Sequence, residues 1–141
     1  MFANKKLFGA LIITILLLTA CGGQGGAKTV NITLTDYAIE SSQTSFEVGV
    51  PYHFVVTNKG PSNHEIMIMA PLSDEQMGMS MDMEEMDKMA LAMIEEDDLE
   101  TGKTMTLDYT FSEPAPAGTL EFACHSSGHY EQGMKLPITV K

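Results

Sequence analysis

The chain has 141 residues, which is enough for one folded domain and leaves little for a second. It carries 19 acidic residues against 8 basic ones, all of them lysines, so its formal net charge is −11. This balance argues against nucleic acid and anionic lipid headgroups as partners, and it favours a protein partner with a basic docking patch.

Residues 1–20 have the pattern of a bacterial export signal. Lys5 and Lys6 form a positive start, and the apolar run after them is too short to span a bilayer comfortably. The sequence LTAC, ending at Cys21, resembles the lipobox of bacterial lipoproteins, in which the chain is cut before a cysteine that is then lipidated. The alternative is an ordinary secretory signal cleaved near Ala20. We expect lipidation at Cys21, and therefore a protein anchored at the extracytoplasmic face of the cell membrane, at the cell surface or on the periplasmic side.

A glycine-rich tether follows the expected anchor, so we assign residues 21–27 to the lipidated cysteine and tether and residues 28–141 to the folded domain. If Cys21 is lipidated, Cys124 is the only thiol left, and the domain has no internal disulfide. A lone thiol in an oxidising compartment needs burial, a partner or a metal.

Alternating apolar and polar residues predict short strands through most of the domain, beginning with Val30, Ile32 and Leu34 on one face. Turn signals separate them, including the stretch EPAPAG at 113–118. Seven or eight such strands favour an all-β, antiparallel Greek-key sandwich. The expected strands are 29–37, a short one near 45–48, 52–57, 64–69, 103–111, 119–125 and 135–141.

Residues 73–102 interrupt this pattern with an acidic, Met-rich insertion. The segment holds most of the acids and seven of the 12 methionines. The 3-4-3 spacing of Met83, Met86, Ala90 and Met93 predicts one helical face, with Ser80 as its cap. We interpret Met83, Met86 and Met93 as a hydrophobic stripe packed on the sandwich.

Soft metal-binding side chains gather near the C-terminus, where Cys124, His129 and Met134 are spaced C-x4-H-x4-M. A thiolate, an imidazole and a thioether suit copper rather than magnesium or calcium. The alternative is that Cys124 is a small buried hydrophobe and Met134 a core residue. A second imidazole ligand would come from one of the other histidines: His53, His64 or His125.

The stretch FACHSSGHYEQGMKLPITV resembles the C-terminal signature of the blue copper proteins, or cupredoxins, and its loop length is closest to the auracyanin and rusticyanin types. The stretch TNKGPSNHEIMI is similar to the segment that carries the family's upstream histidine, here His64. The resemblance implies one type 1 copper per chain, with His64, Cys124 and His129 as strong ligands and Met134 as a weak axial ligand. It also implies a monomeric one-electron carrier whose partners are redox proteins of the cytochrome or oxidase type.

Three further residues, two histidines and one glutamate, are not expected to be copper ligands. We expect His125 to leave its strand on the face opposite Cys124 and to lie at the surface near the site. His53 is expected on a polar, outward strand face. Most of the family has asparagine where this chain has Glu65, and a carboxylate there would tend to stabilise Cu(II) and so alter the redox potential.

The alternating thioethers of Met77, Met79 and Met81 have two interpretations: a hydrophobic stripe laid on the sandwich, or a Cu(I) site, because they resemble motifs that collect Cu(I) outside the cytoplasm. They support an alternative function, in which the protein handles copper and exchanges it with copper-handling partners. We expect no enzymatic activity, because a multicopper oxidase or nitrite reductase needs a second site with further histidines, and the chain has only four.

Overall fold

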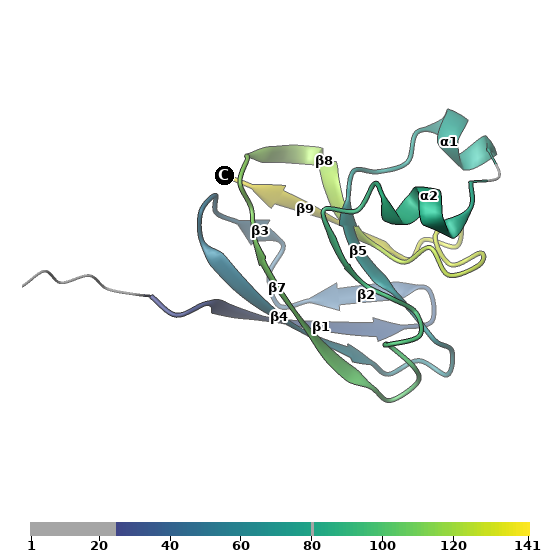
Figure 1. Ribbon diagram of the computed structural model, residues 1–141, viewed down its shortest axis with the longest axis horizontal. Helices are drawn as coiled ribbons and strands as arrows, with labels where there is room; N and C mark the ends of the chain where they lie inside the picture. The colour runs from purple at the N-terminus through teal and green to yellow at the C-terminus, as the bar shows by residue number, and fades with distance from the viewer. Residues whose placement is uncertain (1–24, 80) are drawn as a thin grey trace, which may run out of the picture.

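The computed structural model describes residues 25–79 and 81–141, which form two packed β-sheets with short helices at one end (Figure 1). The predicted signal at 1–20, the predicted lipidation at Cys21 and the predicted cap at Ser80 lie outside the described residues. Among the described residues, no helix has the length and apolar character needed to cross a membrane.

The first sheet contains four strands, and β1 pairs antiparallel with β2 but parallel with β4. Val30, Ile32 and Leu34 of β1 are buried, as their alternation predicts. The strands, in spatial order, are β2 (Ala38–Ser41), β1 (Lys28–Thr35), β4 (Pro51–Asn58) and β7 (Thr104–Thr110).

The second sheet contains five strands and carries most of the residues of interest. Its edge strand β3 pairs parallel with β9, and the other neighbours are antiparallel. In spatial order the strands are β3 (Ser45–Phe46), β9 (Lys135–Val140), β8 (Ala115–Ala123), β5 (Ile66–Met69) and β6 (Ala92–Ile94).

The all-β sandwich prediction is confirmed, with three corrections. The described residues form nine strands rather than seven or eight, because β2 and β6 add short edge strands. Two of the pairings are parallel, so the sandwich is not purely antiparallel. The predicted turn at 113–118 largely belongs to β8, whose pairing with β9 is irregular between Ala115 and Leu120. Gly118, with φ of 83°, allows the strand to continue through that irregularity.

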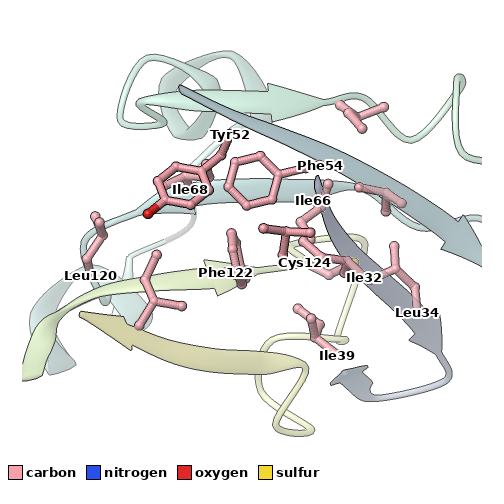
Figure 2. Close-up of a cluster of buried hydrophobic side chains, with 14 of the residues drawn as sticks. Ile32, Leu34, Ile39, Tyr52, Phe54, Ile66, Ile68, Leu120, Phe122 and Cys124 are labelled. Atoms are coloured by element: carbon pink, nitrogen blue, oxygen red, sulfur yellow. The ribbon is translucent and has the colours of Figure 1, made fainter. Parts of the chain in front are cut away.

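An aromatic core fills the space between the sheets (Figure 2). Phe46 contacts four other rings in this core, with centroid separations of 4.9 to 6.0 Å: Tyr52, Phe54, Phe111 and Phe122. Each buried side chain of this size stabilises the fold by about 1.5–3 kcal/mol. Cys124 belongs to the same core and is fully buried, so the candidate metal ligand is fixed by the packing between the two sheets.

The insertion is not the single long helix that the methionine spacing predicts. It contains α1 (Asp74–Gly78), capped by Ser73, and α2 (Met83–Asp87), capped by Asp82. Met93 lies on strand β6, opposite Met67 of β5. Residues 92–94 pair with β5 through backbone hydrogen bonds and form the edge strand β6. This pairing with a strand distant in sequence determines their structure, although their local spacing favours a helix.

The insertion covers the outer face of β5 and β8. A small second core lies there, formed by Met67, Met69, Met86, Ala123 and Tyr130. Because of this cover, all four residues of β5 are buried, and not only the inward-facing pair Ile66 and Ile68 that alternation predicts. The insertion therefore turns an outer sheet face into a second interior.

Candidate metal centre

The loop between β8 and β9, residues 124–134, folds back on itself through its own backbone and is called the ligand loop below. The amide of Cys124 donates to the carbonyl of Met134 at 3.1 Å, and the amide of Met134 donates to the carbonyl of His129 at 3.0 Å. Gly128 and Gly133 adopt positive φ angles of 77° and 100°, which glycine tolerates best. These bonds bring the three C-x4-H-x4-M residues close to one another.

His64 reaches the ligand loop from the turn that precedes β5. The buried side chain of Asn58 organises this turn: its amide donates to the carbonyls of Ser62 and Leu99, and its oxygen accepts from the amide of Gly60 at 2.9 Å. A Cβ atom at Gly60 would lie 2.7 Å from His64 Nε2. The N-x-G sequence therefore has a structural role here. Asn58 fixes the shape of the turn through its hydrogen bonds, and Gly60 leaves room for the imidazole of His64.

Three potential donor atoms converge in this region. The Nδ1 atoms of His64 and His129 lie 3.2 Å apart, and Cys124 Sγ lies 3.9 Å from the first and 3.6 Å from the second. These separations are those expected between neighbouring nitrogen and sulfur ligands of one metal ion, whose bonds are about 2.0–2.3 Å long. Among the described residues, this is also where His, Cys, Asp and Glu donor atoms cluster closely enough to hold a metal ion.

The electrostatics of Cys124 and His64 suit a metal rather than a proton. Burial raises the pKa of the Cys124 thiol, whereas hydrogen bonds involving Ser126 and the backbone of Glu65 act to lower it. Burial, followed by repulsion from His129, lowers the pKa of His64, so its imidazole favours the neutral form. A cation at the centre would stabilise the thiolate that burial alone disfavours.

Asp36 supports His64 from the side away from the donor cluster. Its Oδ1 lies 3.5 Å from His64 Nε2, too long for a good hydrogen bond, and both atoms are buried without another partner. A carboxylate behind a ligating histidine orients the ring and raises its basicity. No sequence pattern points to Asp36, because it lies in the turn between β1 and β2, far along the chain from the copper signature.

Met134 is fully buried and belongs to the same core cluster as Cys124. With His64, Cys124 and His129 it completes a soft donor set of two imidazoles, a thiol and a thioether. The residues present therefore fit one type 1 copper. The axial role of Met134 stays a prediction.

The predictions for the other two histidines, His53 and His125, have different outcomes. His53 lies outside the donor cluster, on the first sheet, and its Nδ1 is 2.6 Å from Asp108 Oδ1, which agrees with the expected outward position. The expected surface position of His125 is wrong: the residue is only 8% exposed, and its ring stacks on Tyr130 with centroids 4.2 Å apart, although it lies on the face opposite Cys124 as expected. The insertion covers the face of β8 that alternation would leave to solvent, and burial lowers the pKa of His125 to about 4.

Glu65 is buried and joins the two chain segments of the site. Its Oε1 accepts a hydrogen bond of 2.7 Å from the amide of His125, so it ties the start of β5 to the end of β8. Burial is the main reason that its pKa is raised to about 7. The carboxyl group thus makes a bridging contact beside the cysteine.

At the surface, the ring of Tyr37 meets that of His129 edge-on, with centroids 5.5 Å apart. Tyr37 is 43% exposed and has a positive φ of 63° in the turn after β1. Of the three clustered donors, His129 alone is not fully buried. It is therefore the donor nearest to the surface.

Known structures share this architecture at low sequence identity. Auracyanin from the photosynthetic bacterium Roseiflexus castenholzii is 22% identical, with a TM-score of 0.60 over 82% of this chain and 99% of that one. Auracyanin A, a "blue" copper protein from Chloroflexus aurantiacus, is 18% identical with a TM-score of 0.57 over 82% and 100%. An azurin from Methylomonas sp. strain J is 13% identical with a TM-score of 0.55 over 82% and 99%. No family model and no curated protein sequence matches the chain. The chain therefore has the cupredoxin fold.

Proposed function

We propose that the protein carries single electrons through a type 1 copper held by His64, Cys124, His129 and, more weakly, Met134. The observation that supports this most is the convergence of two imidazole Nδ1 atoms and a buried cysteine sulfur within 3.9 Å of one another. Copper supplies the one-electron couple, since it cycles between Cu(I) and Cu(II) in such soft donor sets. The cupredoxin fold and the blue copper proteins that share it favour the same function.

The protein's own residues keep the donors in place. Cys124 is anchored in the aromatic core, and His64 is held between Gly60 and Asp36. A site supported on packed strands changes little when its charge changes by one, which keeps the reorganisation on electron transfer small. Burial of Cys124 and His64 excludes water, and His129 beside Tyr37 gives the electron its path to the surface.

The strong acidity favours a redox partner with a basic docking patch, and attachment through Cys21 would keep the carrier at the membrane. Cys21→Ser tests this attachment, because it removes the lipidation site. We expect the variant to leave the membrane fraction and to change in mature mass. Unchanged mass and membrane partition would instead favour an ordinary secretory signal.

A redox titration of the copper-loaded, full-length chain tests the carrier function. We expect one electron per chain, reversible reduction without loss of copper, and electron exchange with a basic soluble cytochrome that slows as ionic strength rises. Copper release on reduction, or exchange that does not depend on ionic strength, would contradict the proposal.

A further inference from the structure

A cavity of about 570 Å³ lies between the insertion and the ligand loop. Figure 1 shows α1 and α2 at the end of the sandwich where the loop between β8 and β9 turns. Five thioethers of the insertion contribute to its lining, and His125 with its loop neighbours contributes from the ligand loop. The residues concerned are Met77, Met79, Met81, Met83 and Met86 in the insertion and His125, Ser126, Ser127, Gly128 and Glu131 in the ligand loop.

The methionines of this cavity fall into two groups. Met86 is buried in the small second core, and Met81 packs against that core. Met77, Met79 and Met83 are 43%, 57% and 42% exposed, although they line the same cavity. Burial would stabilise a methionine by about 1.5–3 kcal/mol, so packing does not account for three thioethers left open to the cavity.

His125 gives an independent indication of a ligand. Its side chain lines the cavity and is more than nine-tenths buried, and its Nε2 is buried without a hydrogen-bond partner. A buried polar atom without a partner costs about 1–3 kcal/mol, and in native proteins such an atom usually has an unseen partner. The hydrogen bond from its amide to Glu65 and the stack on Tyr130 hold the imidazole in place.

The charges around the cavity favour a cation. Asp82, Glu96 and Glu131 contribute to its lining, and no lysine does so among the described residues. Carboxylates alone would favour a hard cation, but the remaining donors are thioethers and an imidazole. Thioethers are neutral and soft, so they select Cu(I) over zinc and Cu(II).

We propose that this cavity is a second metal site, specific for Cu(I), in which His125 and the thioethers of Met77, Met79 and Met83 are the ligands. It differs from the Met77, Met79 and Met81 set predicted from sequence, because Met81 packs on the second core and Met83 faces the cavity. His125 directly follows Cys124, so the two copper sites are joined by one peptide bond. The proposal does not depend on the electron-carrier function.

An anaerobic titration of the full-length chain with Cu(I), in competition with a chromogenic chelator, tests the second site. Wild type should bind two Cu(I) per chain. The triple variant M77L/M79L/M83L keeps apolar bulk, and His125→Phe keeps the stack on Tyr130. Each should weaken the second equivalent at least tenfold. Met89→Leu is the matched control, since Met89 packs on the same small core but does not line the cavity, and it should still bind two.

Methionine-methyl NMR identifies the ligands and separates the two sites. The second equivalent of Cu(I) should shift the methyl signals of Met77, Met79 and Met83 and leave that of Met105 in place. The same shifts should persist in Cys124→Ser, where the first site is lost. A wild-type chain that stops at one Cu(I), or a second equivalent that survives either cavity variant, would overturn the proposal. The two variants alter different parts of the cavity lining, one in the insertion and one in the ligand loop. Either variant can therefore test the proposal if the other fails to fold.

Discussion

Two regions of this molecule contain soft metal-binding side chains, but the burial of these side chains and the contacts that hold them differ between the regions. At the metal centre, Cys124, His64 and Met134 are fully buried, and the donors are held by backbone hydrogen bonds and by the sandwich core. In the insertion, Met77 on α1, Met79 directly after α1 and Met83 on α2 are exposed around a cavity. A preorganised set suits a metal that stays while its charge changes, and a looser set suits a metal that comes and goes.

His125 and Tyr130 connect the two regions. Both belong to the ligand loop, yet they face the insertion and the small core beneath it. The hydroxyl of Tyr130 donates to Glu121 on β8 at 2.6 Å and accepts from the amide of Leu72 at the start of the insertion at 3.3 Å. The insertion is thus attached to the sandwich close to the metal centre, and the variants below perturb one region at a time.

Gly60→Ala should have the largest effect on the buried region. Its Cβ would meet His64 Nε2 at 2.7 Å and Asp36 Oδ1 at 3.0 Å, so the imidazole must move away from its position. We expect copper affinity to fall at least about tenfold and stability to fall by about 1–3 kcal/mol. A chelator competition and a thermal melt measure both.

Gly118→Ala is the control for this variant. Gly118 has φ of 83° but open space around its Cβ position, so alanine should cost about 1–2 kcal/mol of backbone strain and leave copper binding unchanged. Equal copper affinity in Gly60→Ala and wild type would show that the turn does not position His64.

Tyr130→Phe should loosen the insertion and leave the buried donors in place. It removes the hydroxyl between Glu121 and Leu72 and leaves a buried carboxylate without its partner. We expect a loss of about 1–3 kcal/mol in the free energy of unfolding and faster amide exchange in the insertion. Tyr109→Phe on β7 is the control. A Tyr130 variant as stable as wild type would mean that other contacts attach the insertion.

Met134→Leu should change the potential of the buried centre and not its occupancy. Leucine removes a weak donor and leaves three strong ones, so copper should stay bound while the reduction potential rises. The expected shift corresponds to about tenfold in the reduction equilibrium, or ~1.4 kcal/mol. Loss of copper from this variant, measured by metal analysis, would make Met134 a primary ligand.

Glu65→Gln should give the smallest effect. The amide oxygen of glutamine can still accept the bond from the amide of His125, but the negative charge that Glu65 carries above its pKa of about 7 is removed, so the comparison is made above that pH. We expect a rise in the potential equivalent to less than about tenfold in the reduction equilibrium, without loss of copper. A fall in the potential would mean that Glu65 acts through the geometry of the bridge and not through its charge.

The sequence predicts the buried region well because its signals are local. Val30, Ile32 and Leu34 alternate within one strand, and Cys124, His129 and Met134 lie within one short loop. His64 is distant in sequence, and it was identified only through the resemblance of its N-x-G context to a known family. Gly60 and Asn58 then supply the physical reason for that context.

The insertion was harder to predict because its structure depends on distant partners. Met93 follows a helical spacing but pairs with Met67 on β5, a contact across 26 residues that no local pattern shows. The burial of His125 depends on the same cover, so alternation placed it wrongly at the surface. Asp36 reaches His64 from a turn whose sequence carries no sign of a metal.

The optical spectrum of the Cu(II)-loaded chain, compared with that of Cys124→Ser, tests the central claim most directly. A short thiolate bond in a trigonal donor set gives an intense visible charge-transfer band, so wild type should be strongly coloured. Cys124→Ser should lose the band and keep the fold, because the aromatic core holds the two sheets together without the sulfur. A colourless wild type that binds Cu(II), or a variant that keeps the band, would contradict the account.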